Sequence, residues 1–283
     1  MITASTRETY GKTLLELGRE NPDIAVVGGD LNKSTFIHLF AQEFPHRFFD
    51  VGPAEQNMMG IAAGLASSGK VAFASTFAVF GSSRPYDQIR VSIAQPHLNV
   101  KIVVTHAGLL TGEDGMSAQS IEDLALMCAL PGFTVIIPAD SPETARAVRE
   151  AASTHGPFYI RLSRPSTPVV HGGDFSFQVG KAEQLRDGSD ATIIAYGIMV
   201  KQALDAAETL AGEGIQCRVL NMATLQPVDT AAIVAAARAT GAVVTAEEHL
   251  RHGGLGSIVG RVLGEHHPVP LETVALDGYA ESG

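Results

Sequence analysis

Residues 48–74 read FFDVGPAEQNMMGIAAGLASSGKVAFA, two short apolar runs with a helical pattern between them. Met58 and Leu65, two turns apart in that pattern, mark its apolar face. The flanking runs, 48–51 and 71–74, have the length of buried strands. A strand, a helix and a second strand in this order indicate an α/β fold.

The same alternation extends in both directions from this unit. Upstream, a helical pattern over 6–20 ends at Asn21-Pro22, before the apolar run 24–27. Downstream, we expect helices over 84–95, 119–129 and 141–155 and strands over 100–105, 134–138 and 158–161. The pattern predicts a doubly wound domain over residues 1–165, with a mostly parallel sheet and helices on both of its faces.

A second, smaller α/β domain is expected over residues 191–283. Residues 166–190 contain Pro168 and the pair Gly172-Gly173 but few apolar periods, so we interpret them as a linker. After the linker the alternation restarts. We expect strands at 191–196, 216–221, 242–246 and 271–276, and helices at 198–211, 229–239 and 255–266.

Composition narrows the function classes. The 20 Lys and Arg against 30 Asp and Glu give a net charge of −10, so we expect no nucleic-acid partner. Apolar stretches are broken by Gly, Ser and Thr well before a membrane span is reached, so we expect no membrane partner. The N-terminus lacks the apolar region of a secretory signal. Cys128 and Cys217 lie in apolar surroundings, which suits two unpaired buried cysteines in a reducing compartment. We therefore expect a cytoplasmic protein.

Two stretches after expected strands carry candidate functional side chains. Glu55 begins a helix, where an acidic residue is favoured by the helix dipole alone but also suits a ligand site at a sheet edge. Phe77 and Phe80 are three residues apart, a spacing typical of core packing, in a Ser- and Thr-rich loop that also suits ligand contacts.

Polar side chains follow two further strands. His106, Glu113 and Asp114 lie in a glycine-rich loop, either as solvated charge or as ligand contacts, and their spacing matches no metal motif, so we expect no metal ligands in this chain. Arg161 and Arg164 end the last strand of the first domain, where they serve solubility or hold an anion. The stretch EEH at 247–249 precedes GGLGS at 253–257, which is weak evidence for phosphate binding because glycines also serve tight turns.

The order of these motifs resembles the C-terminal half of transketolases, in the form found as a separate subunit. The resemblance rests on GPAEQNMMGIAAGLA, ASTFAVF, RPYDQIR, THAG, GEDG, RLSRP, EEH and GGLGS. It covers essentially the whole chain and implies a thiamine-diphosphate pyrimidine-binding domain followed by a transketolase C-terminal domain. It also implies transfer of a two-carbon ketol unit between sugar phosphates.

The resemblance implies a set of cofactor contacts. Glu55 would hydrogen-bond the N1′ atom of the aminopyrimidine of thiamine diphosphate and favour its imino form, which takes the C2 proton of the thiazolium. That role calls for a dry pocket that keeps or shares the proton of the carboxyl group. Phe77 and Phe80 would stack on the pyrimidine, and Asp30 and Leu31 would lie beside the cofactor at a subunit interface.

The resemblance also implies sugar contacts. His106 and Asp114 would contact the sugar, and Arg164 its phosphate. Two positions depart from the family pattern: Pro53 replaces an isoleucine, and Ala118 stands where a His or Gln usually contacts the donor. Because a polar partner is lost at 118, the exact donor and acceptor stay open.

A partner chain is expected as well. Thiamine diphosphate enzymes hold the diphosphate through Mg²⁺ on a GDG segment followed by Asn, and GEDG at 112–115 is a different motif. We therefore expect the diphosphate and Mg²⁺ to be held by an N-terminal partner subunit in an α2β2 assembly. The chain ends inside a family motif at 281–283, so a short tail is expected beyond it.

Three other functions are compatible with parts of the sequence. The β subunit of a 2-oxo acid dehydrogenase decarboxylase shares the fold and the glutamate, but RLSRP and the stretch from ASTFAVF to DQIR favour transketolase. A non-catalytic partner-binding subunit is less consistent with the retained Glu55, His106 and Asp114. A nicotinamide dehydrogenase is weaker still, because no GxGxxG follows the first strand of either domain.

Overall fold

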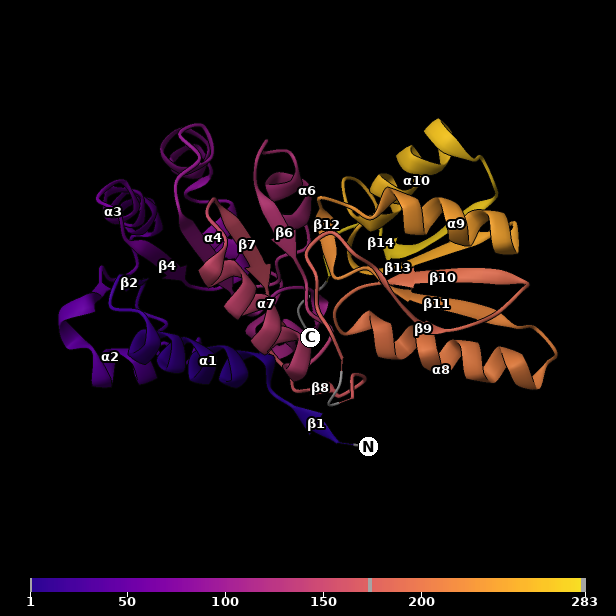
Figure 1. Ribbon diagram of the computed structural model, residues 1–283, viewed down its shortest axis with the longest axis horizontal. Coiled ribbons are helices and arrows are strands. Elements are labelled where there is room, and N and C mark those ends of the chain that lie inside the picture. Colours follow the sequence, from indigo (N-terminus) through magenta and orange to yellow (C-terminus); the bar gives the residue numbers. More distant parts are fainter. Residues whose placement is uncertain (1, 173–174, 281–283) are drawn as a thin grey trace.

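The structure is a computed structural model that describes residues 2–172 and 175–280. Two helix-covered sheets lie side by side in it, with a two-stranded ribbon of β1 (Thr3–Ala4) and β8 (Thr167–Pro168) near the N-terminus (Figure 1). The first sheet holds mainly the indigo-to-magenta part of the chain and the second the orange-to-yellow part. Both are mostly parallel, which confirms the expected α/β class.

Seven strands form the first sheet. Their spatial order is β12 (Thr224–Gln226), β6 (Thr134–Ile136), β7 (Phe158–Arg161), β5 (Val100–Val104), β4 (Val71–Ser75), β2 (Ile24–Gly28) and β3 (Phe48–Asp50). Every residue of β2, β4 and β5 is buried, because helices cover both faces of the sheet. That double burial explains why these strands appear in the sequence as short apolar runs.

Helices on one face are α1 (Thr6–Glu20), α2 (His38–Glu43) and α7 (Ser141–Ser153). The other face carries α3 (Glu55–Ser67), α4 (Ala78–Ser82) and α6 (Asp123–Cys128). Local signals fix the bounds of α1: the Ser5 side chain accepts a hydrogen bond from Glu8 N, and the helix ends before Asn21-Pro22. Four short turns complete this part: η1 (Pro45–Arg47), α5 (Tyr86–Gln88), η2 (Ile89–Ala94) and η3 (Leu109–Asp114).

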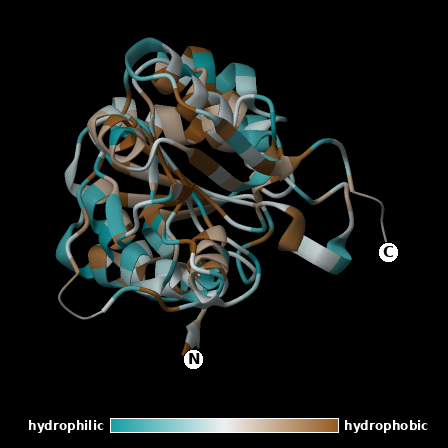
Figure 2. Ribbon diagram, turned by 90° about the vertical axis from the view of Figure 1, so that its right-hand side faces the viewer, coloured by the Kyte–Doolittle hydropathy of each residue, from teal (hydrophilic) through white to brown (hydrophobic). Residues whose placement is uncertain are grey.

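Five strands form the second sheet, in the order β14 (Leu271–Leu276), β13 (Val243–Leu250), β10 (Ala191–Ala195), β11 (Cys217–Asn221) and β9 (Glu183–Arg186). Helix α8 (Met199–Gly212) packs on one face, and α9 (Thr230–Thr240) and α10 (Leu255–His266) pack on the other (Figure 1). One apolar core runs from Met58 of α3 to Ile233 of α9 and Val259 of α10, so the two sheets share a continuous interior. In Figure 2 the hydrophobic colour gathers on the inner strands and the hydrophilic colour on the outer helices.

The structure differs from the expected elements at two helices. The segment expected as one helix over 84–95 contains α5 and the π-helical turn η2 instead. The helix expected from 119 begins only at Asp123, because Ser120 is bridged to Ala107 and accepts a hydrogen bond from Gly108 N at 2.8 Å. The late start of α6 thus follows from a contact with the neighbouring loop rather than from local propensity.

Two strands also cross the expected domain limits. Strand β9 lies within the segment expected as a linker and pairs antiparallel with β11 as an edge strand. Strand β12, from the second half of the chain, pairs antiparallel with β6 at the edge of the first sheet. Both are short, and long-range pairing selects them. The limits 1–165 and 191–283 stay a prediction.

Among the described residues, no helix is both long and apolar enough to cross a membrane.

Candidate active site

The carboxyl ends of the parallel strands gather the candidate residues at one edge of the first sheet. Gly28, the last residue of β2, is in register with Asp50 of β3 and with Ser75 of β4. The chain then leaves each strand on the same side, as ligand sites in parallel α/β sheets require. The residues that follow β2, β3, β4, β5 and β7 in this way are Asp30, Glu55, Phe77, His106 and Arg164.

Glu55 is the first residue of α3 and is 4% exposed. Its carboxylate accepts hydrogen bonds from Arg84 Nη1, at 3.2 Å to Oε1 and 3.1 Å to Oε2. A cavity of about 530 Å³ opens beside it, lined by Pro53, Ala54, Glu55, Gln56, Asn57 and Arg84. The sequence predicts a dry pocket for this carboxyl group, whereas the structure pairs it with a half-exposed guanidinium.

Two neighbouring aromatic rings, Phe77 and Phe80, connect Arg84 of this cavity with His106. The rings of Phe77 and Phe80 are 6.1 Å apart and nearly parallel, with an interplanar angle of 13°. The Arg84 guanidinium lies 4.1 Å from the centre of the Phe80 ring. On the other side, the Phe77 ring stacks on His106 at 3.6 Å. The two phenylalanines therefore face different groups: one lies on the Glu55 side and the other on the His106 side.

A second cavity, also about 530 Å³, is lined by Arg7, Ser34, Phe77, His106, Asp114, Arg164, Pro165 and Ser166. Arg164 forms ion pairs through Nε with Asp114, at 3.3 Å, and through Nη2 with the exposed Glu113, at 2.6 Å. Arg7 donates a hydrogen bond to Ser34 O at 2.8 Å. Two guanidinium groups line this cavity, and such planar groups can bind an anion that accepts several hydrogen bonds.

His106 is a neutral hydrogen-bonding group in this cavity. Burial, together with the nearby charges of Arg7 and Arg164, lowers the pKa of His106 to about 3. Its Nδ1 lies 2.8 Å from Thr105 Oγ1, and its Nε2 lies 4.0 Å from Asp114 Oδ2. A neutral imidazole beside a carboxylate can form hydrogen bonds with the hydroxyl groups of a sugar, but it has no positive charge to attract an anion.

Asp30 and Leu31 do not line the His106 cavity itself. They line a depression of about 470 Å³ together with Asn32, Lys33, Ser34, His38, Ala41, Gln42 and Phe48. The Asp50 carboxylate joins this loop to the one before Glu55, because its Oδ1 accepts hydrogen bonds from Asp30 N at 3.1 Å and Gly52 N at 3.0 Å. Ser34 lines both the depression and the His106 cavity, so these openings adjoin one another.

Three residues that sequence reasoning missed line these cavities. Arg7 lies in the first turn of α1, and its sequence neighbours carry no ligand-binding pattern. Ser34 lies in the loop after β2, and no sequence pattern marks it as a ligand contact either. Arg84 belongs to the stretch RPYDQIR, and only the structure shows that it pairs with Glu55. Ala118 is buried next to Gln119, whose side chain donates to Leu109 O at 3.1 Å.

Within residues 2–172 and 175–280, no group of three or more His, Cys, Asp or Glu side chains is placed to hold a metal ion. The expected tail at 281–283 lies outside the described residues.

Comparisons with known proteins identify the family of the two domains. The transketolase pyrimidine-binding domain matches residues 3–169, and the transketolase C-terminal domain matches residues 180–282. A Methanocaldococcus jannaschii protein named for the transketolase C-terminal section is 46% identical over 91% of this chain and 81% of its own length. A 6-deoxy-6-sulfo-D-fructose transketolase subunit from a Clostridium species is 43% identical over 98% of this chain and 86% of its own length.

A solved structure titled as a split gene transketolase, an inactive β4 tetramer, is also similar to this chain. It is 52% identical, with a TM-score of 0.91, over 97% of this chain and 89% of the other. A pyrimidine-binding domain followed by a transketolase C-terminal domain defines the class of protein to which this α/β chain belongs. The chain belongs to the transketolase family, a family of transferases, and corresponds to its separate C-terminal subunit. The family implies thiamine diphosphate as the cofactor.

Proposed function

We propose that this chain, with an N-terminal diphosphate-binding partner subunit, transfers a two-carbon ketol unit between sugar phosphates. The assembly we propose is an α2β2 heterotetramer in the cytoplasm. The partner subunit would hold the diphosphate and Mg²⁺. Support for two chains comes from the relatives, which are named as separate subunits, and from a similar β4 tetramer that its title calls inactive.

The observation that carries the proposal is the His106 cavity. Arg7 and Arg164 both line it, and planar guanidinium groups match the oxygens of a phosphate monoester. His106, neutral through burial, and Asp114 lie beside them, where they can accept from or donate to sugar hydroxyls. The cavity therefore has a charged end for the phosphate and a polar wall for the sugar.

The residues around Glu55 fit the pyrimidine ring of thiamine diphosphate. The buried Glu55 carboxylate opens on a cavity that Arg84 also lines, and the Arg84 guanidinium lies on the Phe80 ring, so a flat heterocycle could meet a hydrogen-bonding group and an aromatic face together. When bound, the cofactor supplies the carbon that carries the ketol unit. We propose that Glu55 holds a proton at the ring nitrogen N1′, and that the Arg84 ion pair is shared or replaced as this contact forms.

Asp30 and Leu31 are proposed to lie against the partner subunit beside the cofactor. Their depression adjoins the His106 cavity through Ser34, so a chain that covers it would also enclose the sugar site. The Clostridium relative is named for a sulfonated ketose, and a sulfonate, like a phosphate monoester, presents three terminal oxygens to two arginines. A ketose with either terminal anion is therefore a reasonable donor to test.

Ketol transfer measured with the chain alone and then with the partner subunit tests the proposal. Each reaction contains thiamine diphosphate, Mg²⁺ and a ketose phosphate, and a parallel set contains the 6-sulfo ketose. We expect activity only in the mixture. Cofactor-dependent association without transfer from either donor would contradict the proposed reaction, and activity of the chain alone would contradict the need for a partner.

A further inference from the structure

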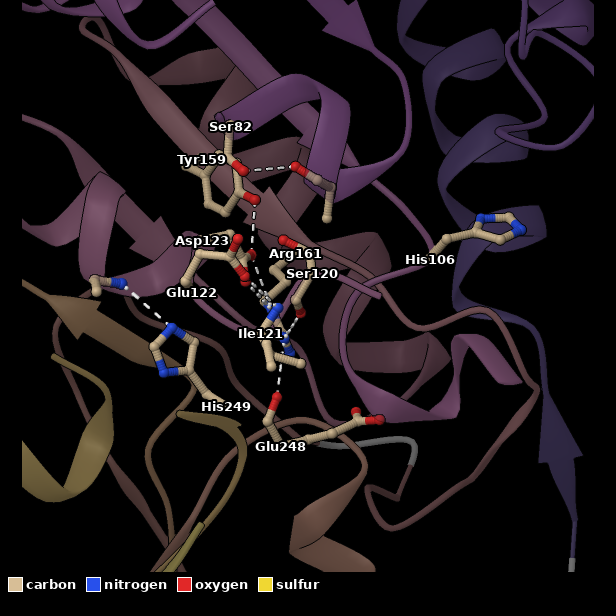
Figure 3. Close-up of polar contacts among 12 residues, drawn as sticks. Ser82, His106, Ser120, Ile121, Glu122, Asp123, Tyr159, Arg161, Glu248 and His249 are labelled. Atoms are coloured by element: carbon tan, nitrogen blue, oxygen red, sulfur yellow. Dashed lines mark hydrogen bonds and ion pairs between the residues drawn. The ribbon is translucent and has the colours of Figure 1, made fainter. Parts of the chain in front are cut away.

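The loop that carries Asp114 is held by a carboxylate from the second sheet. Glu248 belongs to β13 and is 7% exposed. Its Oε1 accepts a hydrogen bond from Leu110 N, in the first turn of η3. Figure 3 shows this carboxylate extending from β13 toward the η3 loop, on the side of the network that faces His106. One side chain of the second domain therefore reaches the wall of the His106 cavity.

The loop is shaped to receive this carboxylate. Gly108 has a φ of +81°, a conformation that favours glycine, and a Cβ added there would overlap the carboxyl group of Glu248. The side chain of Thr111 donates to His106 O at 2.7 Å, so the loop is closed onto the residue that lines the cavity. The Glu248 carboxylate thus occupies the space that a side chain at 108 would need.

The main chain of Glu248 contacts the strand that leads to Arg164. Its carbonyl oxygen accepts a hydrogen bond at 3.0 Å from Nη2 of Arg161, which is buried and paired with Asp123 at 3.0 Å (Figure 3). Arg161 lies three residues before Arg164. Glu248 therefore contacts both segments that position the Arg164–Asp114 ion pair, one through its side chain and the other through its backbone.

The neighbouring carboxylate, that of Glu247, binds a different part of the chain. Glu247 is 3% exposed, and its oxygens accept hydrogen bonds from Leu255 N at 2.7 Å and Gly256 N at 2.9 Å, at the start of α10. It stabilises the second domain without reaching the η3 loop. Glu247 and Glu248 thus form a matched pair: two adjacent buried carboxylates, of which one caps a helix and the other holds the loop.

We propose that Glu248 is a positioning residue for the sugar phosphate: it holds the loop 108–114 so that Asp114 stays beside Arg164. The proposal rests on the proposed function, because it takes the His106 cavity as the sugar phosphate site. It assigns a role in substrate binding to the second domain, through a group that does not itself touch the substrate.

Amide hydrogen exchange of the purified chain tests the hold on the loop. We expect exchange at Leu110 and its neighbours to speed up about tenfold in Glu248→Ala, the effect of losing one hydrogen bond to a charged group. Glu248→Gln keeps an acceptor oxygen and should restore most of the protection. Glu247→Ala should destabilise α10 and leave the loop unchanged. Equal effects of Glu247→Ala and Glu248→Ala on the loop, or no effect of either, would overturn the proposal.

Kinetics of the assembled complex test the consequence for substrate. In Glu248→Ala we expect KM for the ketose phosphate to rise about tenfold without a comparable fall in kcat, because uniform binding is lost. Gly108→Ala should act in the same direction by displacing the carboxylate, and the double variant should cost less than the sum. An unchanged KM in Glu248→Ala would overturn the positioning role. A wild-type complex without ketol transfer would refute the proposed function instead, and the exchange comparison would still decide whether Glu248 holds the loop.

Discussion

Arg84 Nη1 lies 3.1 Å from Glu55 Oε2, so the carboxylate at the start of α3 is paired with a cation of its own chain. The same guanidinium lies 4.1 Å from the centre of the Phe80 ring. Arg84 is about half exposed and Glu55 is buried, so the pair sits at the boundary between the core and the cavity. Any ring nitrogen that reaches Glu55 has to share this ion pair or displace it.

Glu55→Gln should abolish catalysis and leave the fold intact. The amide cannot hold a proton in the proposed way, so we expect kcat of the assembled enzyme to fall by at least about a hundredfold. Unfolding free energy should change little, because Arg84 can return to water. Ketol transfer and urea unfolding measure the two effects. Asp87→Asn, at an exposed carboxylate that pairs with Arg90, is the control and should leave both unchanged. Retained ketol transfer in Glu55→Gln would refute the role.

Arg164→Ala should weaken binding of phosphorylated donors. One charged hydrogen-bonding group is removed from the cavity, so we expect KM for the ketose phosphate to rise about tenfold to a hundredfold. KM for an unphosphorylated ketose should change much less, and Arg7→Ala should repeat this selectivity. Arg149→Ala removes a surface arginine paired with Glu16 and Glu20 and serves as the control. A similar loss for phosphorylated and unphosphorylated donors would contradict the phosphate role.

Glu143 should make the stability of the chain pH-dependent. Burial raises the pKa of Glu143 from 4.5 to about 7, while Asn221 Nδ2 and Ala139 N donate to its oxygens at 2.9 and 2.7 Å. The folded chain therefore retains a proton that the unfolded chain loses, so unfolding free energy falls as the pH rises through this range. In Glu143→Gln this contribution is absent.

Urea unfolding from pH 4.5 to 7 measures that contribution. The wild type should lose about 3 kcal/mol relative to Glu143→Gln over the range, because each unit of pKa shift corresponds to about 1.4 kcal/mol. The nearby Asp140 and His171, which form an ion pair at 2.9 Å, titrate in both proteins. Parallel pH profiles for the two proteins would show that Glu143 is not the group that titrates.

Asp123→Asn should destabilise the boundary between the two sheets. Asp123 is fully buried, accepts from Tyr159 Oη at 2.7 Å and pairs with the buried Arg161 (Figure 3). Removing its charge leaves the guanidinium buried without a counterion, which costs about 3–5 kcal/mol. Asp23→Asn removes an exposed partner of Lys70 and should cost no more than about 1 kcal/mol. Urea unfolding that gave equal losses for both variants would contradict this reading of the buried pair.

Much of the candidate site could be predicted because its residues follow strands whose apolar runs are easy to find. Glu55, His106 and Arg164 each come directly after such a run, and parallel strands bring their carboxyl ends to one edge. The partners Arg84 and Arg7 could not be assigned in this way. They come from an irregular turn and from a helix, and only packing decides that their guanidinium groups face Glu55 and Arg164.

The α/β class and the bounds of α1 and α3 follow from the sequence alone, because the Ser5 cap of α1 and the apolar spacing of both helices act within a few residues. Only the tertiary structure decided that β12 joins the first sheet and that Glu248 holds the loop at Gly108. Those contacts join residues about ninety to 140 positions apart, where hydrogen bonding and shape, rather than local preference, select the partner.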